Sequence, residues 1–165
     1  MSNKTCQFEA ICLLVFPTRV GMDRTKRRVL PLLETKASGH FLCAEPLLDS
    51  IDLENIQYEP GQFLNAMTGI KWEVDQDQTA TRIKEMNALD WVICSGEIGP
   101  GARPLHPDDV KMLKDQCSRS FVPFYFLSWG EFEWLKSSPK RVGRNRTGQE
   151  IEGSAVLEYP AVLKR

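Results

Sequence analysis

The sequence predicts an α/β fold built around a parallel sheet. Four short apolar segments, at residues 9–16, 39–48, 91–94 and 121–129, have the length and composition of buried strands. Stretches with helical periodicity lie between them, and alternation of strand and helix is typical of right-handed crossovers in a parallel sheet. The chain has 165 residues, of which 42% are hydrophobic, which is enough for one domain with a sizeable core.

Composition excludes several classes of protein. No segment approaches the roughly 20 apolar residues of a membrane span, and the formal net charge is only −1. The five cysteines are far apart and form no C-x-x-C pair, so neither a disulfide framework nor a zinc site is indicated. We therefore expect a cytoplasmic protein without a membrane partner.

The first third of the chain predicts a strand, a helix and a second strand. The segment 9–16 is too short and too uniformly apolar for an amphipathic helix. Residues 19–36 carry a leucine-rich stripe that favours a helix, although Pro31 should bend it or mark its first turn. The second strand, within 39–48, breaks at Glu45 because the residue before a proline avoids helical geometry.

The middle of the chain gives weaker signals. Residues 49–78 have mixed polarity and no sustained period, so we expect a surface excursion with at most a helical turn near 63–67. Residues 79–89 are predicted to be helical because Ile83, Met86 and Leu89 recur three residues apart.

The second half repeats the strand and helix pattern. A strand at 91–94 runs into a loop with three glycines. A helix then begins near Pro107, where Asp108 and Asp109 suit the unpaired amides and dipole of an N-terminus. The last apolar run, 121–129, ends at Ser128 and Trp129.

Three side chains come directly after predicted parallel strands and should share one edge of the sheet: Glu45, Glu97 and Trp129. Ligands of parallel α/β folds bind beyond the carboxyl ends of the strands. The glycines of the loop can cradle a ligand or only supply a tight turn. Glu97 can contact a ligand or pair with Arg103, and the Trp129 indole can stack on a ligand or pack under a loop.

The segment 136–146 is strongly basic and contains no acidic residue. It is predicted to form a solvated hairpin, or alternatively an arm that binds the phosphates of a nucleic acid. The candidate residues for that contact are Lys136, Lys140, Arg141, Arg144 and Arg146.

Four segments resemble the C-terminal part of a phage-associated protein family of unknown function: "FLCAEPLL", "LDWVICSGEIGPGARPLHPDDVKMLKDQC", "VPFYFLSWGEF" and "RVGRNRTGQEIEG". Full-length members carry a three-cysteine motif and are similar to radical S-adenosylmethionine barrels, distantly like spore photoproduct lyase. The resemblance covers residue 27 to the C-terminus. It implies a partial, half TIM-like barrel of parallel βα units over residues 1–135, with a divergent leader at 1–26 and the excursion at 49–78. A small basic hairpin and tail, 136–165, would follow.

The resemblance also implies a ligand-binding rim. The positions that match the family pattern there are Glu45, Glu97, Gly99, Gly101, Arg103, Trp129 and Gly130. Ser95, Ile98 and the pair Leu127 and Ser128 depart from it.

Only Cys6 and Cys12 precede the region of resemblance, whereas a radical-enzyme cluster needs three closely spaced thiolates. We therefore expect no iron–sulfur cluster and no S-adenosylmethionine cofactor, and no catalysis by this chain alone. The expected function is binding of a nucleotide-like ligand or a protein partner, in a bacterial host or as a phage-encoded protein. Nucleic-acid binding through the basic segment is the alternative.

A half-barrel would leave two sheet edges with unpaired backbone groups. The leader, the excursion, the basic hairpin, a second copy of the chain or a separately encoded N-terminal half would have to cover them.

Overall fold

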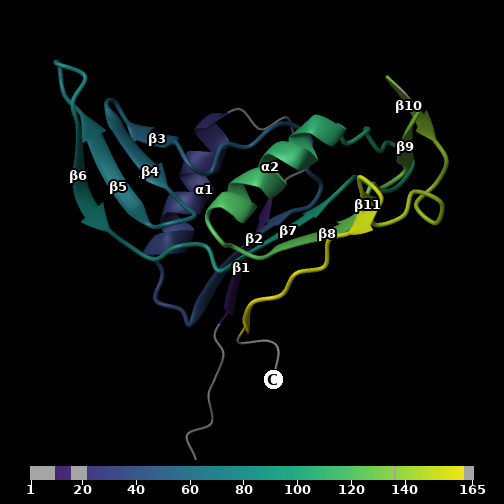
Figure 1. Cartoon of the computed structure of the whole chain (residues 1–165), viewed down its shortest axis with the longest axis horizontal. Helices are drawn as coiled ribbons and strands as arrows, with labels where there is room; N and C mark the ends of the chain where they lie inside the picture. Colours follow the sequence, from purple (N-terminus) through teal and green to yellow (C-terminus); the bar gives the residue numbers. More distant parts are fainter. Residues whose placement is uncertain (1–9, 16–21, 136, 162–165) are drawn as a thin grey trace, which may run out of the picture.

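A parallel sheet of four strands forms the centre of the molecule (Figure 1). The structure is a computed structural model that describes residues 10–15, 22–135 and 137–161. The sheet has the order β1 (Ala10–Val15), β2 (Gly39–Ala44), β7 (Trp91–Ser95) and β8 (Phe124–Ser128), and every neighbouring pair is parallel. Because the strands follow one another in a single direction across the sheet, right-handed crossovers place their helices on one face.

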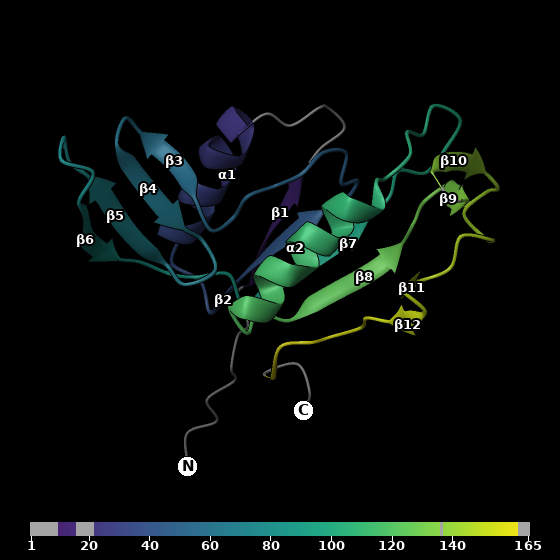
Figure 2. The same ribbon diagram turned by 45° about the horizontal axis from the view of Figure 1, so that its top comes forward.

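The two helices, α1 (Met22–Glu34) and α2 (Pro107–Arg119), lie on the same face of this sheet in both views (Figures 1 and 2). Every second side chain of the strands points toward the two helices and packs against them in the core. The core side chains of the sheet and helices include Leu42, Val92, Phe124 and Phe126 from the strands, and Leu32, Leu33, Val110, Leu113 and Cys117 from the helices. Pro31 lies inside α1. His106 caps α2, because its Nδ1 accepts the Asp108 amide at 3.2 Å.

A second sheet, antiparallel throughout, lies beside the first. It is a meander of β3 (Ile56–Glu59), β4 (Gln62–Asn65), β5 (Ile70–Val74) and β6 (Ala80–Glu85). Two short hairpins follow β8: β9 (Phe132–Leu135) with β10 (Ser138–Arg141), and β11 (Glu150–Ile151) with β12 (Ser154–Ala155).

The prediction of a partial TIM-like barrel of parallel βα units is wrong. Eight of the twelve strands in the described part of the chain belong to antiparallel sheets, and only two helices of thirteen residues each accompany them. The parallel pairing is confined to the four-stranded sheet. The excursion expected at 49–78 and the helix expected at 79–89 together form the antiparallel meander.

Turn residues explain why the meander forms where a surface loop and a helix were expected. Gly61 and Gly69 adopt φ of +74° and +70°, a conformation that favours glycine, and each joins two short strands. Asn65 Oδ1 accepts the amides of Met67 and Thr68 at 2.9 and 3.0 Å. Ile83 lies in β6 with 46% of its surface exposed, so the three-residue spacing that suggested a helix reflects no buried helical face.

The C-terminal tail covers the outer edge of β8. The Phe126 amide donates to the Val156 carbonyl at 2.8 Å, and the Glu158 amide donates to the Phe124 carbonyl at 3.1 Å. The tail therefore adds a short antiparallel partner to the parallel sheet. No described strand pairs with the other edge, at β1. No helix in the described part of the chain has the length and apolar character needed to cross a membrane.

Candidate functional site

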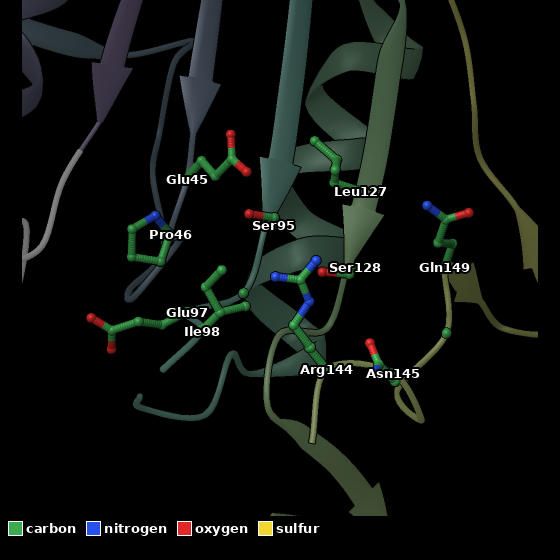
Figure 3. A pocket seen from close by; sticks show the side chains of 12 residues that line it. Glu45, Pro46, Ser95, Glu97, Ile98, Leu127, Ser128, Arg144, Asn145 and Gln149 are labelled. Atoms are coloured by element: carbon green, nitrogen blue, oxygen red, sulfur yellow. The ribbon is translucent and has the colours of Figure 1, made fainter. Parts of the chain in front are cut away.

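A cavity of about 720 Å³, lined by both polar and apolar side chains, opens at the carboxyl edge of the parallel sheet (Figure 3). Because β2, β7 and β8 run parallel, the residues that follow them meet at this edge. The lining residues come from these strand ends and from the loop after β10: Glu45, Pro46, Ser95, Gly96, Glu97, Ile98, Leu127, Ser128, Arg144, Asn145, Gly148 and Gln149.

Backbone hydrogen bonds tie the three strand ends together. The Leu47 amide donates to the Ser95 carbonyl at 2.8 Å, so the chain leaving β2 crosses the end of β7. The Gly96 amide donates to the Ser128 carbonyl at 2.9 Å and continues the pairing of β7 with β8. Ser95 and Ser128 are register partners in that ladder. The floor of the cavity is therefore a rigid part of the sheet.

The loop that carries Arg144 and Asn145 is anchored to the end of β8. The buried Thr147 hydroxyl lies 2.9 Å from the Gly130 carbonyl and 3.2 Å from the Arg144 carbonyl, and both can accept from it. Figure 3 shows the Arg144 side chain extending from this loop toward the ends of β7 and β8. Arg144 is exposed, and its guanidinium makes no ion pair or hydrogen bond with any described residue.

Glu97 is held by Arg103. The Arg103 guanidinium donates to both carboxylate oxygens at 2.8 Å, and the Arg103 backbone amide donates to Oε2 at 2.8 Å. The hydrogen bonds from Arg103 lower the pKa of Glu97 below its usual range. Of the two alternatives for Glu97, the structure shows the ion pair with Arg103.

The β9 and β10 hairpin holds the glycine loop. Glu131 Oε1 accepts the Gly99 amide at 3.1 Å, and Arg141 donates to the carbonyls of Pro100 and Gly99 at 2.8 and 2.6 Å. Arg141 Nη2 also lies 3.5 Å from Glu131 Oε2. These contacts fix the loop from outside the cavity.

The structure brings some of the predicted ligand residues together and separates others. Glu45 and Glu97 line the cavity, whereas Gly99, Gly101, Arg103 and Trp129 are not among the described residues that line it. The Trp129 indole packs on the Phe126 ring, with centroids 4.8 Å apart, and donates to the Glu150 carbonyl at 2.9 Å. Its position under a loop matches the packing alternative.

The described residues predicted to contact nucleic acid differ in their surroundings. Arg144 lines the cavity, and Arg141 is bound to the glycine loop. Lys140 and Arg146 are exposed, and Lys136 lies outside the described residues.

Sequence reasoning missed four polar residues of the cavity: Ser95, Ser128, Asn145 and Gln149. The two serines had a usable signal, because each is the last residue of an apolar strand run. Asn145 and Gln149 reach the sheet only through tertiary structure, and no local pattern marks them.

The described residues contain no group of three or more histidine, cysteine, aspartate or glutamate side chains arranged to hold a metal ion. Cys43, Cys94 and Cys117 are buried. Burial raises the pKa of Cys117 to about 12 and that of Cys94 further. These cysteines are therefore thiols of the core. Cys6 lies outside the described residues.

The fold and the site define a small protein of parallel and antiparallel sheets with a cavity of mixed polar and apolar lining at the carboxyl edge of the parallel sheet. A family model described as "Protein of unknown function (DUF5131)" matches residues 17–160. The chain belongs to this family. Comparison with curated proteins and with solved structures gave no match.

Proposed function

We propose that this chain binds a small nucleotide-like ligand in the cavity at the carboxyl edge of its parallel sheet. The observation that carries the proposal is the pair of unengaged, opposite charges at this cavity, Glu45 and Arg144. Neither side chain has an ion-pair partner among the described residues. The cavity, at about 720 Å³, lies within the range of about 300 to 1,000 Å³ typical of small-molecule sites.

The lining chemistry suits a nucleotide better than an apolar molecule. The Glu45 carboxylate can accept from sugar hydroxyls, and the Asn145 and Gln149 amides can donate and accept as a base edge requires. Ile98 and Leu127 offer apolar surface to a base or sugar face.

Calorimetric titration of the full chain with adenosine, adenosine monophosphate, adenosine triphosphate and S-adenosylmethionine tests the proposal. We expect saturable binding of at least one of them, and a stabilisation of about 2.7 kcal/mol at a ligand concentration 100 times the Kd. Glu45→Gln should weaken binding, because a carboxylate accepts stronger hydrogen bonds than an amide. Glu59→Gln is the matched control, since Glu59 is an exposed carboxylate in β3 of the other sheet. Absence of binding by all four compounds would overturn the proposal.

Nucleic-acid binding is a second candidate, favoured by three exposed cations. Lys140, Arg144 and Arg146 make no ion pair with any described residue. A phosphate-binding arm predicts that retention on single-stranded DNA or RNA falls steeply with salt. The double variant Lys140→Gln with Arg146→Gln should then weaken retention while leaving titration with adenosine monophosphate unchanged. Retention equal to that of the wild type would exclude this candidate.

A further inference from the structure

We infer that Ser95, Ser128 and Arg144 form a subsite for a phosphoryl group of the ligand. The inference rests on the proposed function and specifies which part of the ligand the cavity recognises. It predicts a phosphorylated ligand as opposed to a bare nucleoside.

The two serines lie side by side at the end of the sheet. Ser95 ends β7 and Ser128 ends β8, and they are register partners across the parallel ladder. The register shifts between Cys94 and Ser95, so the pairing places the two serines next to one another at the strand ends without fixing the face to which each side chain projects. Both residues line the cavity, so their hydroxyl groups reach it from adjacent positions.

Both hydroxyl groups retain a proton to donate. Ser95 is only 3% exposed, yet its side chain makes no hydrogen bond with any described residue. Every fully buried polar side-chain atom of the described residues has a hydrogen-bond partner. The Ser95 oxygen has none, so it keeps some exposed surface, and Ser95 is one of the residues that line the cavity. Ser128 Oγ accepts the Gly130 amide at 3.3 Å, which leaves its O–H available. The Ser95 hydroxyl is therefore free to donate to a bound acceptor.

Arg144 supplies the positive charge. Its loop is anchored by Thr147, and Figure 3 shows its guanidinium directed toward the two serine-bearing strand ends. A guanidinium presents several N–H donors in one plane and matches phosphate geometry. The two serine hydroxyl groups and the Arg144 guanidinium together provide donors for all three terminal oxygens of a phosphate. A phosphoryl group offers these donors one oxygen more than a carboxylate and carries up to two negative charges.

The carboxylates at the cavity do not cancel this charge. Glu97 is already neutralised by Arg103. Glu45 follows β2, two strands away from Ser128 in the sheet order, and is available for the hydroxyl groups of the same ligand. The cavity therefore has an anion-binding end at β7 and β8 and an acceptor end at β2.

The experiment compares adenosine monophosphate, adenosine and inorganic phosphate on the full chain by calorimetric titration. We expect the monophosphate to bind at least tenfold more tightly than adenosine, and inorganic phosphate to compete with the monophosphate but not with adenosine. Arg144→Gln and Ser95→Ala should each lower affinity for the monophosphate about tenfold and leave adenosine binding unchanged. Arg144→Lys should retain part of the affinity, because the charge remains.

Arg146→Gln is the matched control, because Arg146 is an exposed arginine of the same loop that does not line the cavity. It should bind all three compounds as the wild type does. Thermal midpoints of the free variants check that each one is folded. Equal affinity for adenosine and its monophosphate would overturn the phosphoryl subsite and leave the proposed function standing. If adenosine, adenosine monophosphate and inorganic phosphate all fail to bind, the phosphoryl subsite is overturned. If adenosine triphosphate and S-adenosylmethionine also fail to bind, the proposed function is overturned as well.

Discussion

Gly96 and Gly130 lie against one another where β7 and β8 end. A β-carbon on Gly96 would stand 2.2 Å from the Trp129 carbonyl oxygen, and one on Gly130 would stand 2.3 Å from the Glu97 carbonyl oxygen. Both of these oxygens belong to the backbone. They cannot move aside without breaking the backbone hydrogen bonds between Gly96 and Ser128 and between Glu131 and Glu97. The close approach of two backbones fixes the floor of the cavity.

Gly96→Ala should therefore be strongly destabilising. Overpacking against backbone typically costs 1 to 3 kcal/mol, and we expect about 3 kcal/mol in the free energy of unfolding, measured with urea. Gly101→Ala is the control, because no atom lies within 4 Å of a β-carbon there and Gly101 has no positive φ. It should change stability by less than about 0.5 kcal/mol. Equal losses in the two variants would contradict the steric argument.

The ion pair of Glu97 and Arg103 should make stability depend on pH. The pKa of Glu97 is lowered in the folded state, so its contribution is present above the unfolded pKa of about 4.3 and is lost as pH falls through the folded value. At pH 7, Glu97→Gln should cost about 1 to 2 kcal/mol, because charge-assisted hydrogen bonds are replaced by neutral ones.

Urea denaturation of the wild type and Glu97→Gln between pH 7 and pH 3 measures this effect. The difference in unfolding free energy between the two proteins should shrink as the carboxylate is protonated. Glu133→Gln, at an exposed residue of β9, should show no comparable loss at pH 7. A constant difference across the pH range would contradict the assignment.

The local sequence pattern of short apolar runs predicted where the strands of the parallel sheet lie. The predicted segments 39–48, 91–94 and 121–129 contain or coincide with most of β2, β7 and β8. Runs of buried apolar residues are a local signal, and parallel pairing then places whatever follows the strands at one edge. Glu45 and Glu97 could therefore be placed at the cavity from sequence.

The remaining parts of the fold and site depend on contacts distant in sequence. The β3 to β6 meander is set by turns at Gly61 and Gly69 and by pairing between strands of mixed polarity, whose residues show no clean alternation. Arg144 lines the cavity from a loop that Thr147 anchors to Gly130, seventeen positions earlier. Trp129 follows β8 as predicted, but its indole turns toward Phe126 and Glu150, and the sequence could not decide its orientation.

Gln116 joins α2 to the segment between β2 and β3. Its Nε2 donates to the Ile51 carbonyl at 2.8 Å, and its Oε1 accepts the Leu53 amide at 2.7 Å. The side chain is 3% exposed, so both backbone groups would lose their partner if it became apolar. Gln116→Leu should cost about 2 to 3 kcal/mol.

Urea denaturation measures the Gln116→Leu loss, and hydrogen exchange should show faster exchange of the Leu53 amide. Gln57→Leu is the control, because Gln57 is an exposed glutamine in β3. It should leave both measurements near the wild-type values. An unchanged exchange rate at Leu53 in Gln116→Leu would show that this hydrogen bond does not hold the segment.

Phe121 directly follows the C-cap of α2, Ser120, in a conformation that glycine would adopt with less strain. Its φ is +56°, and its surface is 94% exposed, so the ring gains little from packing. The Val122 amide donates to the Cys117 carbonyl at 2.9 Å. In helix ends with this hydrogen bond, a glycine in the left-handed conformation is favoured at the position of Phe121. Phe121→Gly should therefore raise the free energy of unfolding by about 1 kcal/mol, since a left-handed residue with a β-carbon costs about 1 to 2 kcal/mol. Phe121→Ala removes the same ring but keeps the β-carbon, so it should give no such gain. Urea denaturation of both variants separates the two effects, and equal stability of the glycine and alanine variants would show that backbone strain at Phe121 is not what limits this helix end.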